Sequence, residues 1–329
     1  MLVSVITLYY NRADQVDESI RSLLNQTYRN IEIIAVDDGS TDDTLEKLRA
    51  YDDPRMSVIT HPNKGLIHSI IEAVELARGE LIAIHGSGDI SYPERIEEQV
   101  KLLQSRPEVG VVGCIVENVN TLTGESEQFY VPNLDRIDVT RHLLDKGNVF
   151  THGEVMFRRS IYNQVGGYRR TFVYSQDLDL WLRMSRVTKF ANVEKLLYRR
   201  YKLADGVSTV PEKRLMQIYL AEHARQCCEM RLETGEDPVD RYGILSPFLR
   251  RRTRRFAIRL LQHAMEEFRE KRLDNARMLI RLSLMERWMI KNALFSLVIS
   301  IYRKSEWTGL KLFKLYGWLG KLRRKLRAS

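Results

Sequence analysis

Cysteine, proline and long apolar runs are scarce in this chain of 329 residues. Its three cysteines, Cys114, Cys227 and Cys228, lack metal-ligand spacing, which argues against a disulfide framework or a zinc site and suits a reducing cytoplasm. The longest apolar run, 293–301, contains two serines and is too short to span a bilayer, so we expect no transmembrane segment. With only 8 prolines and 44% hydrophobic residues, the composition allows a sizeable regular core.

Charge is distributed unevenly along the chain. Residues 241–329 hold 23 Lys and Arg against 6 Asp and Glu, and because the net charge of the whole chain is +9, the first 240 residues carry −8. A basic tail on an acidic body indicates an anionic partner surface. Nucleic acid is disfavoured as that surface, because no recognised reader module accompanies the charge.

The basic clusters 250–255 and 321–327 accompany apolar and aromatic residues between 310 and 319. This composition is typical of helices that lie on anionic lipid. We therefore expect a cytoplasmic protein whose C-terminal helices attach it peripherally to the inner face of the cell membrane. The alternative is that these helices pack on the rest of the chain and their charges are simply solvated.

Apolar segments rich in β-branched residues alternate with segments of helical periodicity. The expected strands cover 2–10, 31–37, 56–60 and 80–85, three helices lie between them, and a further buried strand covers 109–116. This order predicts an α/β fold with a doubly wound, mostly parallel, Rossmann-like sheet. From 211 onward the pattern is helical, with two helices joined near 272–274, so we divide the chain into domains 1–212 and 213–329.

The strand at 31–37 ends in two adjacent carboxylates, Asp37 and Asp38, followed by Gly39. Glycine permits a sharp turn at this point, and the next residues, Ser40 and Thr41, can cap a helix. Open α/β sheets bind ligands at the carboxyl edge of their strands, so we expect a polar ligand here. The alternative is that Tyr10 is a core residue and the two carboxylates only cap the next helix.

Several motifs occur together in a fixed order, which is more specific than any one of them. They are Tyr10-Asn11-Arg12, Asn25-Gln26-Thr27-Tyr28, Val36-Asp37-Asp38-Gly39-Ser40-Thr41-Asp42, Asn63-Lys64-Gly65, Glu154-Val155-Met156-Phe157-Arg158-Arg159, Gly166-Gly167-Tyr168 and Gln176-Asp177-Leu178-Asp179-Leu180-Trp181-Leu182-Arg183. The series resembles the family 2 nucleotide-sugar glycosyltransferases, which are inverting enzymes of the GT-A fold. The resemblance covers residues 2–200.

The resemblance implies a donor site, an acceptor site and a catalytic base. Asp38 would contact the nucleoside, and Asp177 would accept the proton of the acceptor hydroxyl. The donor side is expected to include Tyr10, Asn11, Asp37, Asp38, Asn63, Gly65 and Asp89, and the acceptor region His152, Glu154, Gln176 and Trp181. For Asp179 and Arg183 we expect an ion pair one helical turn apart at a solvated helix start rather than a catalytic role.

The sequence departs from the family where a metal ion is expected. Family members usually have Asp-x-Asp-Asp after the strand at 80–85, but here Gly86 and Gly88 stand at the first two carboxylate positions and only Asp89 remains. A hard cation needs several oxygen ligands, which makes binding of Mg²⁺ or Mn²⁺ doubtful. Asp89 with His85 or His152 and the diphosphate could still hold the ion, or backbone N–H groups at the glycines could bind phosphate instead.

Together these features predict a glycosyltransferase that moves a sugar, with inversion, from a nucleotide-diphosphate donor to a saccharide or lipid-linked acceptor in surface polysaccharide or lipopolysaccharide assembly. The glycines leave a second hypothesis open, a non-catalytic nucleotide-sugar-binding or scaffold protein. A nucleotidyltransferase is disfavoured, because no Gly-rich, Lys-containing triphosphate loop follows the first strand.

Overall fold

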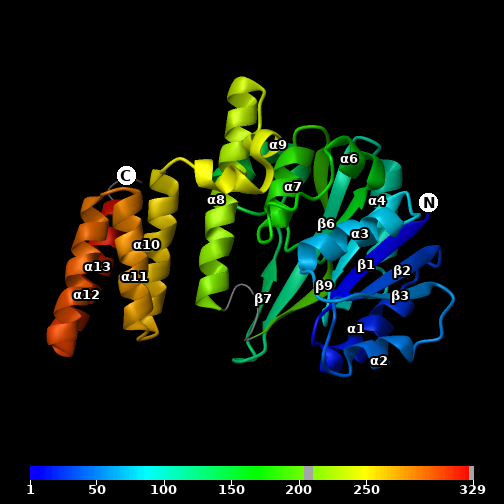
Figure 1. The fold of residues 1–329 in the computed structure, drawn as a ribbon, viewed down its shortest axis with the longest axis horizontal. Helices are drawn as coiled ribbons and strands as arrows, with labels where there is room; N and C mark the ends of the chain where they lie inside the picture. Colours follow the sequence, from blue (N-terminus) through cyan, green and yellow to red (C-terminus); the bar gives the residue numbers. More distant parts are fainter. Residues whose placement is uncertain (204–209, 326–329) are drawn as a thin grey trace. The chain divides into compact units, whose positions relative to one another are not determined.

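The computed structural model describes residues 1–203 and 210–325, without the side chains of Arg303 and of residues 316–325 (Figure 1). The side chains of the basic cluster 321–327 and of Trp318 and Leu319 therefore lie outside the described residues. The contacts divide the chain into two compact units, Met1–Leu249 and Arg250–Ser329. The first unit thus continues beyond residue 212, where the sequence suggested a boundary.

A mixed, mostly parallel sheet forms the centre of the first unit (Figure 1). Among the described residues it has nine strands, eight of them in the order β3-β2-β1-β4-β8-β6-β9-β5, with β7 paired to β6. The strands are β1 (Val3–Tyr9), β2 (Ile31–Asp37), β3 (Met56–Thr60), β4 (Leu81–Gly86), β5 (Ile90–Ser91), β6 (Val109–Asn120), β7 (Ser126–Phe129), β8 (Met156–Arg158) and β9 (Lys189–Lys202). The predicted α/β fold is confirmed.

Helices cover both faces of this sheet. Those that pack on strands are α1 (Ala13–Leu24), α2 (Thr44–Arg49), α3 (Leu66–Leu76), α4 (Arg95–Ser105), α6 (Arg159–Gln164) and α7 (Gln176–Met184). Outside these, α5 (Val139–Asp145) and α8 (Pro211–Thr234) pack on α7, and α9 (Pro238–Tyr242) packs on α8. Consecutive side chains on a strand point to opposite faces of the sheet, so Ile34 belongs to the apolar cluster on one face and Ile33 to the cluster on the other. Strands buried on both faces explain the continuous apolar runs in the sequence.

The second unit is a set of packed helices, α10 (Arg254–Arg269), α11 (Leu273–Glu286), α12 (Ile290–Lys304) and α13 (Glu306–Lys325). The first two meet where the sequence predicts a junction. Phe268 anchors the core of this unit, with ring centroids 5.7 Å from Phe295 and 4.8 Å from Phe313. Within residues 1–203 and 210–325, none of the helices combines the length and the apolar character needed to cross a bilayer.

Candidate active site

Three parallel strands end next to one another at the edge where the sequence predicts a ligand. β1 lies between β2 and β4, with Tyr9 opposite Asp37 and Leu8 opposite Gly86. The loops that follow these strands therefore share the carboxyl edge of the sheet, where open α/β folds bind their ligands.

The loop after β1 presents Tyr10 and Asn11. Tyr10 is 48% exposed, so it is not a core residue, and its ring is accessible for stacking. Asn11 has a left-handed φ of 51° and joins this loop to the next one. Its backbone N–H donates to Ser40 Oγ at 3.0 Å, and its Oδ1 accepts from the Thr41 N–H at 2.8 Å.

Asp37 and Asp38 are both buried and both accept hydrogen bonds from the protein. Asp37 accepts from the Ser40 N–H and from Thr60 Oγ1 at 2.8 Å. Asp38 reaches the start of α3 instead, where it accepts from the N–H groups of Lys64 and Gly65, each at 3.0 Å. Neither carboxylate caps α2, the helix that follows them. Their observed role is to join the loops after β2 and β3, which fixes the ligand edge.

The loops after β2 and β3 also pack closely through Gly39. Gly39 has a φ of +73°, and a Cβ there would lie 2.5 Å from the backbone nitrogen of Asn63. Asn63 is itself exposed, while Gly65 begins α3 with a φ of 85°. Of the predicted donor-site residues in these loops, Tyr10 and Asn63 are therefore the exposed ones.

Asp89 is buried and tied to β9. Its Oδ2 accepts from the Tyr198 hydroxyl at 2.8 Å, and its Oδ1 accepts from the Tyr201 N–H at 3.0 Å. The same Tyr198 oxygen accepts from the Gly86 N–H at 2.8 Å. Burial raises the pKa of Asp89 to about 6, although these hydrogen bonds and the charge of Arg200 oppose the rise.

His85 forms part of a buried hydrogen-bonded chain beneath this edge. Its Nε2 lies 2.9 Å from Ser19 Oγ and its Nδ1 lies 3.0 Å from Ser91 Oγ, which also accepts from Arg95. Burial lowers the pKa of His85 to about 3, with a further contribution from the positive charge of Arg95. Both ring nitrogens have partners, so His85 serves a structural role and is not a free metal ligand.

The residues at this edge do not fit a divalent cation held by side chains. Gly86 and Gly88 carry no ligand atoms, and Asp89 has partners on both oxygens. Among the described residues no three His, Cys, Asp or Glu side chains are grouped in a way that could hold a metal ion. Asp89, the one carboxylate expected at a cation, is thus engaged with β9.

The loop before β8 lies against Asp89. A Cβ on Gly153 would lie 2.4 Å from the Tyr198 hydroxyl and 3.2 Å from Asp89 Oδ2. The preceding residue, His152, has a φ of 82°, and its Nε2 lies 2.8 Å from the Tyr168 hydroxyl. A left-handed backbone at a non-glycine residue stores strain, which is frequent at functional sites.

Two residues assigned to the acceptor region, Glu154 and Trp181, are buried. Glu154 is buried and accepts from the N–H and the hydroxyl of Thr151, at 2.8 and 2.5 Å. Trp181 is also buried, with its ring 6.3 Å from that of His152. Neither side chain is accessible, so each contributes to this region by packing against the loop, through Thr151 for Glu154 and His152 for Trp181.

Asp177 lies in the first turn of α7, immediately after Gln176. Both side chains are half-buried, and Ser175, before them, has a left-handed φ of 56°. Asp177 Oδ2 accepts from Asn148 Nδ2 at 2.6 Å, and its Oδ1 accepts from the Leu178 N–H at 2.8 Å. The carboxylate is therefore held in a fixed orientation and keeps an accessible side.

The opposite face of α7 is fixed by a buried ion-pair network. Asp179 accepts from Arg183 at 2.7 Å and also from Arg169, which in turn donates to Asp237 at 2.7 Å. Burial alone would raise the pKa of Asp179, but the two guanidinium groups outweigh it and the pKa is lowered. Asp179 pairs with Arg183 as predicted, but the helix start is not solvated at this position, because Asp179 is buried.

His152 and Arg200 connect Asp89 with Asp177. Burial lowers the pKa of His152, the negative charge of Asp177 opposes this change, and the positive charge of Arg200 adds to it. Arg200 also acts on Asp89. Arg200 is thus close enough to Asp89 and to His152 to affect the pKa of each, and His152 is in turn close enough to Asp177 for the carboxylate to affect its pKa.

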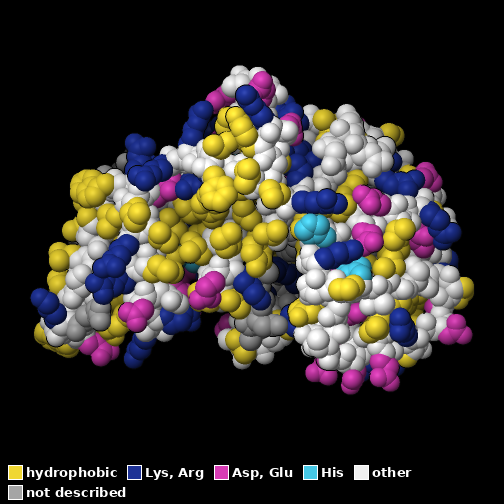
Figure 2. All heavy atoms as spheres, in the orientation of Figure 1, with side chains coloured by type: hydrophobic (Ala, Val, Ile, Leu, Met, Phe, Trp, Pro, Cys, Tyr) yellow, Lys and Arg dark blue, Asp and Glu magenta, His cyan; other side chains and the backbone are white. Residues whose placement is uncertain are grey.

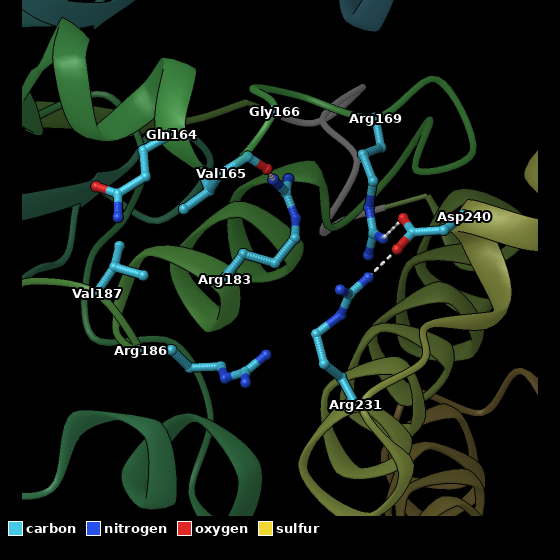
Figure 3. Close-up of a pocket in the computed structure, with 10 residues that line it drawn as sticks. Gln164, Val165, Gly166, Arg169, Arg183, Arg186, Val187, Arg231 and Asp240 are labelled. Atoms are coloured by element: carbon cyan, nitrogen blue, oxygen red, sulfur yellow. Dashed lines mark hydrogen bonds and ion pairs between the residues drawn. The ribbon is translucent and has the colours of Figure 1, made fainter.

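A cavity of about 570 Å³ opens elsewhere in the first unit, at the ends of α6, α7 and α8 (Figure 3). Its lining includes Arg169, Arg183, Arg186 and Arg231 but none of the predicted site residues. Figure 3 shows Arg169 and Arg231 reaching toward Asp240, and Arg183 pairs with Asp179. Most of its positive charge is neutralised, so we assign the candidate site to the strand edge.

Sequence reasoning did not assign roles to Asn148, Tyr168, Tyr198 or Arg200. Tyr168 directly follows the Gly166-Gly167 motif, so the sequence marked this position, but it did not indicate that Tyr168 contacts His152. Tyr198 and Arg200 lie two residues apart on β9, so alternation places both on one face of the strand, toward Asp89. That alternation could have indicated the pair, but nothing in the sequence indicates that β9 closes over Asp89.

Known proteins resemble this chain in sequence and in fold. The family model described as glycosyl transferase family 2 matches residues 4–166. The chain is 34% identical over 206 residues to the putative glycosyltransferase EpsE of Bacillus subtilis (strain 168), covering 60% of this chain and 72% of that relative. It is 28% identical over 212 residues to the chondroitin synthase of Pasteurella multocida (strain Pm70), covering 63% of this chain and 21% of that protein.

Among solved structures, the mannosyltransferase PcManGT from Pyrobaculum calidifontis, in complex with GDP-Man and Mn²⁺, is similar with a TM-score of 0.55. The identity is 17%, over 95% of this chain and 84% of that chain. The sheet, its covering helices and its polar carboxyl edge thus define a GT-A glycosyltransferase fold. The sequence relationship is more specific: the chain belongs to glycosyl transferase family 2, the nucleotide-sugar glycosyltransferases.

Proposed function

We propose that the chain transfers a sugar, with inversion, from a nucleotide-diphosphate donor to a saccharide or lipid-linked acceptor during polysaccharide assembly. Asp177 is the base. The acceptor oxygen bonds to the anomeric carbon while the bond from that carbon to the diphosphate breaks, the hydroxyl proton passes to Asp177, and the nucleoside diphosphate leaves. The observation that carries this proposal is the fixed carboxylate of Asp177, held by Asn148 and the Leu178 N–H beside His152.

On the donor side, Tyr10 offers an exposed ring to the nucleobase, and Asn11 sets the conformation of its loop. Asp37 and Asp38 act through the loops that they join, and Asn63 provides an exposed amide next to them. On the acceptor side, His152 and Gln176 flank Asp177. The resemblance of the chain to a chondroitin synthase supports a saccharide as acceptor.

The test of the catalytic proposal is release of nucleoside diphosphate from a panel of UDP-, GDP- and dTDP-sugars by the full chain. We expect Asp177→Asn to lower turnover by about 100-fold or more, because a positioned base contributes that much, while nucleoside diphosphate binding is retained. Asp145→Asn, at an exposed carboxylate on α5, is the matched control and should change turnover little. If the wild-type chain binds donor but never turns it over, the non-catalytic alternative is correct.

We also propose that the second compact unit binds an anionic membrane surface. Ile290, Leu294 and Leu297 are 66%, 47% and 55% exposed and recur at helical spacing, so they form one apolar stripe on α12. Figure 2 displays apolar and basic side chains together on this unit, the combination that suits a lipid surface. Binding to phosphatidylglycerol vesicles but not to phosphatidylcholine vesicles would support the proposal. If the chain binds neither kind of vesicle, the proposal is refuted.

A further inference from the structure

The glycines after β4 are built into the packing of the site. A Cβ on Gly86 would lie 2.3 Å from Asp89 Oδ2 and 3.3 Å from the Tyr198 hydroxyl. Gly88 has a φ of +86°, and a Cβ there would lie 2.8 Å from the Cβ of Gln15. A side chain at position 86 would therefore displace Asp89 or Tyr198, and one at position 88 would strain the backbone and press on Gln15. The present packing of the site thus leaves little room for carboxylates at these two positions.

Both oxygens of Asp89 are occupied by hydrogen bonds from the protein. One oxygen binds the Tyr198 hydroxyl, which also binds the Gly86 N–H, and the other binds the Tyr201 N–H. Asp89 therefore links the end of β4 to β9. It cannot turn toward a cation without leaving two buried donors unsatisfied, a change that costs free energy.

A departing nucleoside diphosphate still requires positive charge. Its phosphates carry about two negative charges in the donor and gain more as the sugar leaves, so transfer is slow unless that charge is stabilised. Side-chain cations and oriented N–H groups can supply the stabilisation in place of a metal ion.

Two other basic side chains near the strand edge are already engaged. Lys64 pairs with Glu72, and Arg95 is buried and donates to Ser91 Oγ and to the Ile84 carbonyl. These two cations are therefore fixed by contacts within the protein.

Arg200 has the position that is needed. It lies two residues after Tyr198 on β9, on the face toward Asp89, whereas Arg199 faces the other way and pairs with Glu117 at 2.7 Å. Within residues 1–203 and 210–325, the Arg200 guanidinium has neither an ion pair nor a hydrogen bond, and the residue is half-buried. Its charge reaches both Asp89 and His152. An unpaired guanidinium thus lies between the strand edge and the acceptor loop.

We infer that this chain binds the diphosphate of its donor without a divalent cation, and that Arg200 supplies the positive charge that a metal ion supplies elsewhere. The inference rests on the proposed function and deepens it. A guanidinium is suited to this role, because its planar N–H groups bind two phosphate oxygens at once and it keeps its charge at any physiological pH.

The experiment is calorimetric binding of UDP, GDP, CDP, ADP and dTDP to the full chain, in excess EDTA and in excess MnCl₂. The nucleotide that binds should do so in both buffers, with Kd values within about twofold of each other. Arg200→Gln should weaken binding in EDTA by about tenfold or more, because a hydrogen bond to a charged group is lost. Arg200→Lys, which keeps the charge, should recover part of the loss.

Arg199→Gln is the matched control, since it removes the same charge from the adjacent residue on the opposite face of β9. It should change the Kd by no more than about twofold, as expected for a partly exposed ion pair. Binding that disappears in EDTA and returns with Mn²⁺ would overturn the inference but leave the proposed function intact. Equal effects of the two glutamine variants would overturn the role of Arg200. If no nucleoside diphosphate binds in either buffer, the donor assignment itself fails.

Discussion

Removing the Tyr198 hydroxyl should destabilise the first compact unit by an amount that depends on pH. In Tyr198→Phe, the Gly86 N–H and Asp89 Oδ2 both lose their partner. The ring, which is buried at 0% exposure, remains in place, so no cavity is created. The effect therefore reports the hydrogen bonds of one oxygen atom.

The magnitude follows from the ionisation of Asp89. Its folded-state pKa of about 6 lies above the usual value, so the folded state binds this proton more tightly than the unfolded state does. The contribution of protonated Asp89 to the free energy of unfolding is therefore present at low pH and is lost as the pH rises through about 6. Where Asp89 is ionised, the lost hydrogen bonds should cost about 3–5 kcal/mol, and where it is protonated about 1–3 kcal/mol.

The assay is urea unfolding of the wild-type chain and Tyr198→Phe, at about pH 8 and about pH 4.5, followed through the transition of the first unit. The destabilisation should be about 1–2 kcal/mol larger at the higher pH. In an Asp89→Asn background that difference should vanish. Tyr130→Phe, at an exposed ring, is the control and should change stability by less than about 0.5 kcal/mol. A destabilisation that is the same at both pH values would refute the assigned ionisation.

Three further predictions concern other parts of the molecule. Arg183→Ala should destabilise the first unit by about 3 kcal/mol in urea, because it leaves Asp179 underpaired in the core, whereas Arg186→Ala, at an exposed residue, should not. Gly39→Ala should cost about 2 kcal/mol or more in the same assay, since the Cβ meets backbone at 2.5 Å and the φ is left-handed. Leu297→Glu should reduce sedimentation of the protein with anionic vesicles by about tenfold, because this side chain is 55% exposed on the apolar stripe of α12. An unchanged unfolding midpoint of the variant is the control, and unaltered sedimentation would argue against a role of that stripe in membrane binding.

Regular elements were predictable because their signals are local. The strand at 31–37 is found at those residues, and the junction near 272–274 is found between α10 and α11. Buried strands and amphipathic helices differ in periodicity, which is visible in any short window of sequence. The hairpin of β6 with β7 was missed, because its exposed residues at 126–129 have no apolar alternation.

Contacts at the site were harder to predict because their partners are distant in the chain. Asp89 meets Tyr198 across 109 residues, so its burial cannot be read from the sequence around it. Asp38 was expected at the nucleoside or at the cap of the next helix, but it joins the start of α3 through Lys64 and Gly65. Trp181 was expected at the acceptor and is a core residue. Residue type and order located the edge of the sheet, while tertiary packing decided which side chains remain accessible there.

The crowding around Gly86 also constrains how this protein could change by mutation. Adding one carboxylate would break an existing buried contact before it created a complete set of ligands, so each single-residue step toward cation dependence would lower stability without a gain. Conversion would require simultaneous replacement of Gly86, Gly88 and Tyr198, together with relief of the contact at Gln15. The packing around Gly86 therefore opposes the stepwise introduction of metal-binding carboxylates, and a redesign should begin with the tyrosine.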